Sequence, residues 1–161
     1  MTIAYVGIGS NLDPAPHVRA GVAALRAEFG AVTCSPVYET APVGFEGPAF
    51  YNLVVRLETD RPLAEVVQRL RAIEDRQGRD RAAGGGFGNR SLDLDLLLFG
   101  ECVTREPVTL PRRDVLAYPF VLKPLVDLDP AGRHPELDRT FAELWAEFPG
   151  DPDLRPVPLA L

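Results

Sequence analysis

The order of two hydrophobic periodicities along the chain constrains its fold more than any other feature. Four short runs, spanning 3–8, 31–38, 50–58 and 92–99, are rich in apolar residues and have the length of strands. Two further segments, 17–29 and 63–77, place apolar residues at the spacing of one helical face. The predicted order is therefore strand, helix, strand, strand, helix, strand, and a last short helix is expected over 140–148.

This order is typical of an α+β fold of the ferredoxin-like βαββαβ type, an antiparallel sheet with helices packed on one face. Beyond the last predicted strand, repeated prolines predict a Pro-rich C-terminal extension of short pieces, interrupted at Pro107, Pro111, Pro119, Pro124 and Pro130. A length of 161 residues suits a single domain over 1–161.

Composition excludes several classes of function. A net charge of −6 argues against binding to nucleic-acid backbones, which attract basic proteins. No apolar run approaches the roughly 18 residues of a membrane span, and the first residues lack the basic stretch of a signal peptide. Because Cys34 and Cys102 are the only cysteines, we expect a reduced, cytoplasmic protein. Lys123 is the only lysine among 17 basic residues, so Schiff-base chemistry would depend on it alone.

The predicted strand over 92–99 carries the sharpest chemical signal. Side chains alternate between the two faces of a strand, so Asp93 and Asp95 share one face, about 7 Å apart, while leucines occupy the other. Two like charges on one face repel each other, and oxygen ligands of this kind commonly bind Mg²⁺ together with substrate phosphates. The alternative is a solvent-facing edge of an amphipathic strand.

A group of arginines precedes this strand. Arg76, Arg79, Arg81 and Arg90 lie within or beside a loop over 78–88 that contains several glycines. Guanidinium groups bind phosphate through paired hydrogen bonds, and a glycine-rich loop is typical of a flap that closes over a ligand. The alternative is a solvated charged surface, but strand and loop together favour nucleotide binding and phosphoryl transfer.

Two common nucleotide motifs are absent. Gly7-Ile8-Gly9-Ser10-Asn11-Leu12 follows a strand, but Leu12 stands where a dinucleotide-binding motif needs its third glycine. The chain also has no Gly-x-x-x-x-Gly-Lys-Ser/Thr sequence. Gly9-Ser10-Asn11 is compatible with a tight turn before a helix or with backbone contact to a ligand.

Aromatic and amide side chains could bind a planar heterocycle. Phe50 and Asn52 share a strand face, and Phe120 lies later in the chain. Aromatic rings stack on such a ligand, and an amide hydrogen-bonds its edge. Core packing is the alternative for each residue taken singly.

Several segments together resemble the 6-hydroxymethyl-7,8-dihydropterin pyrophosphokinase family over essentially the whole chain. They are Gly9-Ser10-Asn11-Leu12, Thr40-Ala41-Pro42-Val43-Gly44, Tyr51-Asn52, Ile73-Glu74, Gly78-Arg79, Arg90-Ser91-Leu92-Asp93-Leu94-Asp95-Leu96-Leu97, Leu110-Pro111, Phe120-Val121-Leu122 and Pro124-Leu125. The resemblance implies transfer of the β,γ-pyrophosphoryl group of ATP to the hydroxymethyl group of a reduced pterin, in folate biosynthesis.

The resemblance also implies a distribution of roles. Asp93 and Asp95 would hold two Mg²⁺ ions. Arg79 and Arg90 would act in catalysis and, with Arg81, bind the triphosphate, and Glu74 would lie in the nucleotide region. The pterin would be held by main-chain or packing contacts, one amide hydrogen bond and two aromatic rings, supplied by Thr40, Pro42, Val43, Asn52, Phe50 and Phe120. The expected partners are ATP and the pterin, and the expected state is a monomer.

Some positions depart from the family pattern. Phe87-Gly88-Asn89-Arg90 replaces a usual Trp-Gly-Pro-Arg, Arg112 follows Pro111 where a His is frequent, and Tyr118 stands where many members have an Arg. They keep open a catalytically impaired, ferredoxin-like module that binds pterin and nucleotide. A metal-dependent phosphodiesterase using the two aspartates is a second alternative.

Overall fold

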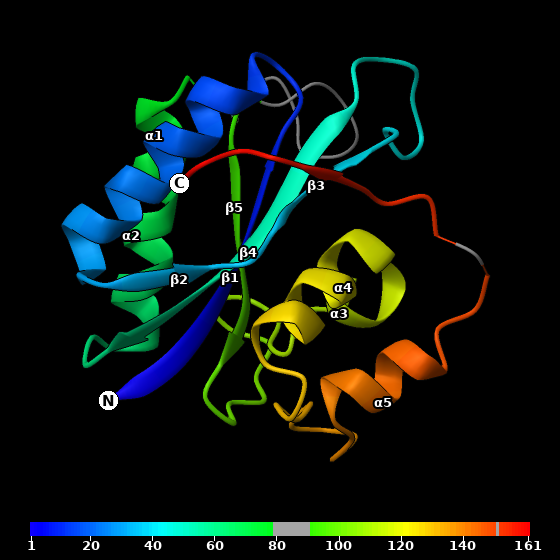
Figure 1. Cartoon of the computed structure of the whole chain (residues 1–161). Coiled ribbons are helices and arrows are strands. Elements are labelled where there is room, and N and C mark those ends of the chain that lie inside the picture. The colour runs from blue at the N-terminus through cyan, green and yellow to red at the C-terminus, as the bar shows by residue number, and fades with distance from the viewer. Residues whose placement is uncertain (79–90, 151) are drawn as a thin grey trace.

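A single antiparallel sheet organises the molecule. The computed structural model describes residues 1–78, 91–150 and 152–161. Within them, the central strand β1 (Thr2–Ser10) pairs with β4 (Phe50–Thr59) on one side and with β5 (Asp93–Phe99) on the other. Two further strands, β3 (Val37–Thr40) and β6 (Arg155–Val157), complete the sheet order β5-β1-β4-β3-β6, and a short strand β2 (Val32–Cys34) also pairs with β4 (Figure 1). The predicted antiparallel α+β architecture is confirmed.

The predicted strand over 31–38 is two strands, β2 (Val32–Cys34) and β3 (Val37–Thr40). The break falls at Ser35-Pro36, where proline lacks the N–H that a continuous ladder needs. Ser35 compensates, because its N–H donates to the carbonyl of Val54 and its hydroxyl accepts from the N–H of Val54, both at 2.9 Å. Both halves therefore stay paired with β4.

The helices α1 (Pro14–Phe29) and α2 (Leu63–Arg76) lie side by side on one face of the sheet (Figure 1). Each buries one apolar stripe against the strands, as their spacing predicted. The stripe of α1 includes Val18, Val22 and Leu25, and that of α2 includes Leu70 and Ile73. These side chains form a hydrophobic core with the apolar residues of β1, β4 and β5.

The opposite face of the sheet is also covered, which corrects the expectation of helices on one face only. The Pro-rich segment forms α3 (Asp114–Ala117), α4 (Pro119–Leu128) and α5 (Phe141–Ala146) (Figure 1). Leu122, Leu125 and Phe141 pack there against Val54 and Leu97 in a second hydrophobic core. Pro119 lies in the first turn of α4, where proline is tolerated because no helical hydrogen bond needs its N–H. Pro124 lies inside the same helix, so the predicted interruption at Pro124 is wrong.

The chain ends in a further strand that the sequence pattern did not predict. β6 (Arg155–Val157) pairs with β3 at the sheet edge, with Val157 opposite Val37. Pro156 lies within it, and proline is tolerated on edge strands because no neighbour there needs its N–H. None of the helices in the described ranges combines the length and the hydrophobicity that a transmembrane span requires.

Candidate active site

Two glycines on β1 leave a trough across the centre of the sheet. Gly9 is paired with Asp93 of β5 on one side and with Asn52 of β4 on the other, so the three residues share one face. Gly7 is paired in the same way with Asp95 and with Val54. Because glycine has no side chain, the surface of β1 is left uncovered between the aspartates of β5 and the side chains of β4.

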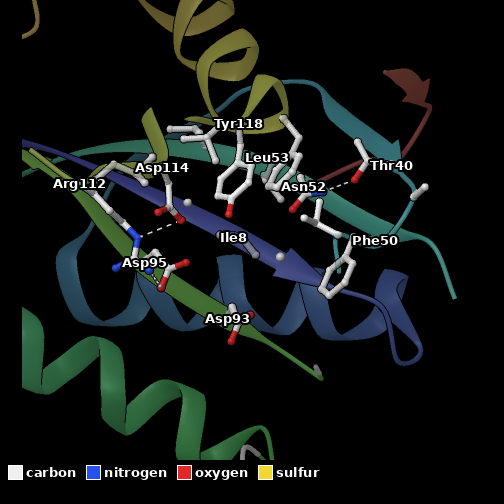
Figure 2. A pocket seen from close by; sticks show the side chains of 18 of the residues that line it. Ile8, Thr40, Phe50, Asn52, Leu53, Asp93, Asp95, Arg112, Asp114 and Tyr118 are labelled. Carbon is white, nitrogen blue, oxygen red and sulfur yellow. Dashed lines mark hydrogen bonds and ion pairs between the residues drawn. The ribbon is translucent and has the colours of Figure 1, made fainter. Parts of the chain in front are cut away.

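The trough is part of a cavity of about 370 Å³ on the face of the sheet that α4 covers. Its lining includes most of the residues to which the sequence assigned a metal or a pterin: Asp93, Asp95, Thr40, Val43, Phe50, Asn52 and Phe120. Figure 2 shows the two aspartates on β5 and Asn52 and Phe50 on β4 around this space. Pro42 does not line the cavity, although its neighbours Ala41 and Val43 do.

Asn52 and Thr40 form a buried polar pair at one end of the cavity. The side-chain amide of Asn52 donates to the hydroxyl of Thr40 at 2.8 Å, and each residue is only 7% exposed (Figure 2). The bond orients the Asn52 amide, so that its remaining donor and acceptor atoms have fixed directions. The arrangement suits recognition of a planar ligand with a hydrogen-bonding edge.

Aromatic rings surround the same cavity. Phe120, at the start of α4, stacks on Tyr118 with ring centroids 5.0 Å apart and an interplanar angle of 15°. Phe45 meets Phe50 edge to face, with centroids 6.3 Å apart. The family resemblance implied a pterin contact for Phe50 and Phe120 but none for Phe45 or Tyr118. The available signal for Tyr118 was a second aromatic residue two positions before Phe120.

Arg112 and Asp114 are cavity residues to which sequence reasoning gave no role. The Arg112 guanidinium lies 3.5 Å from a carboxylate oxygen of Asp95 and 3.2 Å from one of Asp114 (Figure 2). Burial would lower the pKa of the guanidinium, but the carboxylates of Asp95, Asp114 and Glu74 outweigh it and raise the pKa above its ordinary value. Arg112 therefore stays charged and partly neutralises the acidic side of the cavity.

A second cavity of about 140 Å³ adjoins the first at the outer edge of β5. Glu74 of α2 lines it, and its carboxylate accepts a hydrogen bond from the backbone N–H of Leu94 at 2.9 Å. Asp95 and Arg112 line both cavities. Asp95 and Arg112 therefore lie between the two cavities, and the second one also has apolar sides from Leu70, Leu96 and Val108.

Three of the predicted phosphate ligands, Arg79, Arg81 and Arg90, lie outside the described residues, as does most of the predicted flap over 78–88. The described donor set suits a hard divalent cation, because Asp93 and Asp95 present carboxylate oxygens to one cavity. One or two carboxylates are what Mg²⁺ commonly takes from a protein when phosphates supply further ligands.

The chain is similar to a known family of enzymes. The model of the 7,8-dihydro-6-hydroxymethylpterin-pyrophosphokinase family matches residues 5–130. A 2-amino-4-hydroxy-6-hydroxymethyldihydropteridine pyrophosphokinase of Pseudomonas aeruginosa is 39% identical over 150 residues, covering 90% of this chain and 91% of the relative. The enzyme of the same name from Bacillus subtilis is 34% identical over 158 residues, covering 92% and 93% of the two chains.

Solved structures share the fold. The HPPK-DHPS protein of Plasmodium falciparum superimposes with a TM-score of 0.72 at 14% identity, over 92% of this chain and 44% of that one. A second structure of HPPK-DHPS, in complex with substrates, gives a TM-score of 0.71 at 13% identity over 91% and 43%. The chain spans less than half the length of these solved proteins.

Proposed function

Because the chain belongs to the 7,8-dihydro-6-hydroxymethylpterin-pyrophosphokinase family, we propose that it transfers pyrophosphate from ATP to 6-hydroxymethyl-7,8-dihydropterin. The products are AMP and the pterin diphosphate, and the reaction belongs to folate biosynthesis. The observation that carries this proposal is the pair of cavities that share Asp95 and Arg112 in their linings, because a transfer between two substrates needs two neighbouring spaces with charged groups between them.

The larger cavity takes the pterin. Asn52, held by Thr40, reads the hydrogen-bonding edge of the ring system, and Phe50 and Phe120 contact its faces. Val43 borders the same space and Pro42 shapes the loop beside it. The hydroxymethyl group then points along the glycine trough toward the aspartates.

The smaller cavity takes the base end of ATP. Its apolar sides suit a flat heterocycle, and Glu74 lies among them. The triphosphate extends past Asp95 toward the pterin, and Arg79, Arg81 and Arg90 bind it. This placement brings the β-phosphorus of ATP next to the pterin hydroxyl, which displaces AMP.

Asp93 and Asp95 would hold two Mg²⁺ ions in this complex. When bound, the ions supply neutralisation of the phosphate charge and alignment of the phosphate chain. The chain's own residues orient the acceptor and exclude water from it, since Phe50, Phe120 and Tyr118 surround the space beside the aspartates.

Three further properties complete the proposal. The unit β1–α1–β2/β3–β4–α2–β5 is a ferredoxin-like core, supported by the sheet order β5-β1-β4-β3. The protein acts as a monomer. It acts in the cytoplasm, and the free thiols of Cys34 and Cys102 agree with that reducing compartment.

Product analysis tests the activity. The purified chain, incubated with ATP, Mg²⁺ and 6-hydroxymethyl-7,8-dihydropterin, should release AMP only when the pterin is present. Release of ADP would indicate single-phosphate transfer. Binding of both ligands without any product would favour the impaired binding module, and AMP formed without the pterin would favour a hydrolase.

A further inference from the structure

Arg112 occupies a position that bears on how the proposed metal site is filled, and the inference drawn from it rests on the proposed function. Among the described residues that line the larger cavity, Arg112 is the only cationic side chain. Three acidic side chains line the same cavity, Asp93, Asp95 and Asp114, and Arg112 contacts two of them. The Arg112 guanidinium therefore lies where a divalent ion is proposed to bind.

The main chain of Arg112 is fixed to the strand that carries the aspartates. Its N–H donates to the carbonyl of Leu97 at 2.9 Å. The loop before it is closed by two backbone hydrogen bonds between Thr104 and Leu110, at 3.0 and 2.9 Å. These hydrogen bonds anchor the backbone at Arg112, so an exchange of its ion pairs involves the side chain alone.

The two ion pairs of Arg112 differ in what could replace them. Arg112 and Asp95 are each 37% exposed at the side chain, so solvent and ions reach this pair. Asp114 is 30% exposed and contacts the Nε atom at the base of the guanidinium, whereas Asp95 contacts an outer NH₂ group. The contact with Asp95 can therefore break while that with Asp114 persists.

A guanidinium and a divalent cation compete for one carboxylate. Mg²⁺ binds oxygen at about 2.1 Å, and its charge repels a guanidinium held against the same oxygens. We propose that Arg112 is a positioning residue that holds Asp95 while no metal is bound, and that a divalent cation binds only by displacing Arg112 from Asp95. Asp114 keeps the displaced guanidinium beside the site, where the phosphates of the nucleotide offer it a new partner.

This exchange predicts that Arg112 weakens the binding of a divalent cation alone. The test measures Mn²⁺ binding to the nucleotide-free protein, with free Mn²⁺ followed by electron paramagnetic resonance. Arg112→Gln should bind Mn²⁺ about three- to fivefold more tightly than the unaltered chain, the range expected for loss of a half-exposed ion pair. Arg112→Lys, which keeps the charge but lacks the forked guanidinium, should bind with an intermediate affinity.

The neighbouring Arg113 provides the matched control, since it is exposed and lines neither cavity. Arg113→Gln removes the same charge without touching Asp95, so Mn²⁺ affinity should change by less than about twofold. Equal Mn²⁺ affinity of the unaltered chain and both Arg112 variants would overturn the proposal. An equal gain in Arg113→Gln would also overturn it, because net charge rather than contact would then be the cause.

The outcome is separable from that of the proposed function. AMP release by the unaltered chain tests the transfer reaction, and Mn²⁺ binding without nucleotide tests the exchange. A chain that releases AMP but shows no gain in Arg112→Gln would retain the function and lose this inference. A gain in Mn²⁺ affinity in Arg112→Gln without AMP release by the unaltered chain would support the exchange and contradict the proposed function.

Discussion

At the scale of single residues, the site depends on which positions lack a side chain as much as on those that carry one. Gly9 separates Asp93 from Asn52, and a methyl group added there would lie 3.2 Å from the Asn52 amide oxygen. That distance is too short for an ordinary contact, so the Asn52 side chain would have to shift. The trough and the orientation of Asn52 are thus linked.

Gly9→Ala should weaken pterin binding more than nucleotide binding. Overpacking of this size costs about 1–3 kcal/mol, which corresponds to a rise in the KM for the pterin on the order of tenfold. The KM for ATP should change by less than about twofold, because Gly9 lines only the larger cavity. Steady-state kinetics with each substrate varied in turn measures both values, and an equal rise in the two would contradict the assignment of the cavities.

Asp95→Ala should abolish transfer while leaving the pterin bound. Asp95 lines both cavities and does not belong to the Asn52–Thr40 pair. Loss of its carboxylate should therefore impair the transfer step and spare the binding of the pterin. We expect AMP release to fall by at least about a thousandfold, with pterin affinity by isothermal titration within about threefold. Asp60→Ala, which removes an exposed carboxylate that lines neither cavity, is the control. Turnover within tenfold of the unaltered chain would contradict the proposed role of Asp95 in metal binding.

At the scale of elements, α2 fixes the strand that carries the aspartates. The buried carboxylate of Glu74 accepts the N–H of Leu94, the residue between Asp93 and Asp95. Among the described strands β5 lies at the edge of the sheet, so this side chain accepts a backbone donor that no described strand pairs. The helix thereby holds the aspartates in register with the glycine trough.

Glu74→Ala should lower both stability and transfer. Loss of the acceptor leaves a buried N–H without its partner, which costs about 1–3 kcal/mol of unfolding free energy. Glu74→Gln retains an acceptor oxygen of the same reach and should recover most of that loss, as urea unfolding would measure. If Ala and Gln variants were equally unstable, the hydrogen bond to Leu94 would not be the reason for the buried carboxylate.

Elements with strong periodicity could be predicted from the sequence, and so could the residues they carry. The alternation of Leu and Asp placed Asp93 and Asp95 on one face of β5, and both line the cavity. The spacing of Phe50 and Asn52 likewise placed them together. The hydrogen bond from Asn52 to Thr40 could not be predicted from this spacing, because it depends on the register of β3 against β4. That register pairs Asn52 with Tyr38 and depends on the break at Pro36.

The residues contributed by the Pro-rich segment could not be placed in this way. Arg112, Asp114 and Tyr118 lie in short helices and turns with no extended apolar period. Their positions depend on tertiary contacts such as the bond from Arg112 to Leu97, which no local pattern encodes. The same reason accounts for α3 and α4, which no apolar period predicted, whereas α5 confirms the helix predicted over 140–148.

At the scale of the whole molecule, two tyrosines on the sheet connect it to the helix layer formed by the Pro-rich segment. Tyr38 of β3 donates to Asp127 at 2.5 Å, and Tyr5 of β1 donates to Asp129 at 2.7 Å. Burial, and then the neighbouring aspartates, raise the pKa of both hydroxyls, that of Tyr5 to about 12. These bonds hold α4, and with it one side of the larger cavity, against β1 and β3.

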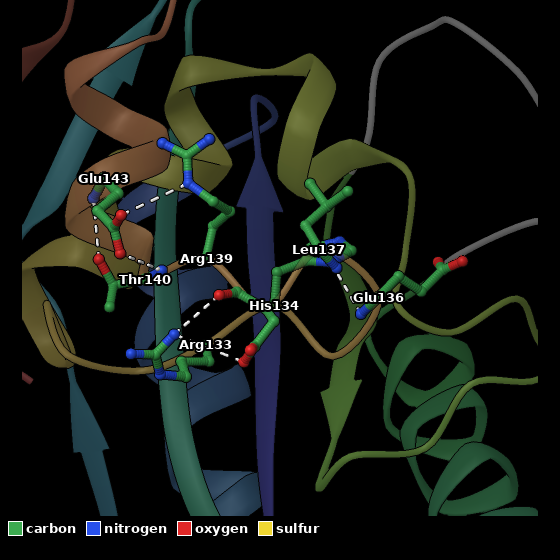
Figure 3. A network of polar contacts seen from close by, with 8 residues as sticks. Arg133, His134, Glu136, Leu137, Arg139, Thr140 and Glu143 are labelled. Atoms are coloured by element: carbon green, nitrogen blue, oxygen red, sulfur yellow. Dashed lines mark hydrogen bonds and ion pairs between the residues drawn. The ribbon is translucent and has the colours of Figure 1, made fainter.

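The turn after α4 is stabilised separately. Thr140 and Glu143 form a capping box at the start of α5, each side chain accepting from the other's backbone N–H at 3.1 Å (Figure 3). The buried His134 accepts from the backbone N–H groups of Glu136 and Leu137 at 3.3 Å. Burial lowers the pKa of His134, in keeping with a neutral ring that acts as an acceptor. These local hydrogen bonds therefore stabilise the segment after α4 separately from the two tyrosines.

The tyrosine connection predicts a loss of stability in alkali. Tyr5 ionises at about 12 in the folded chain and near 10.0 when unfolded, so the folded state retains a proton that the unfolded state releases. This contribution is complete below pH 10 and is lost as the pH rises toward 12. The unfolding free energy of the unaltered chain should therefore fall more steeply across this range than that of Tyr5→Phe. Parallel curves from urea unfolding would contradict the connection.

The proposed reaction transfers an intact pyrophosphoryl group from ATP in one cavity to the pterin in the other. The most direct measurement supplies ATP labelled with ³²P at either the β or the γ position, with Mg²⁺ and 6-hydroxymethyl-7,8-dihydropterin, and locates the label after a single turnover. Both labels should appear in equal yield in the pterin diphosphate, and neither in AMP. Transfer of the γ label alone, or release of both labels as free pyrophosphate, would contradict the account.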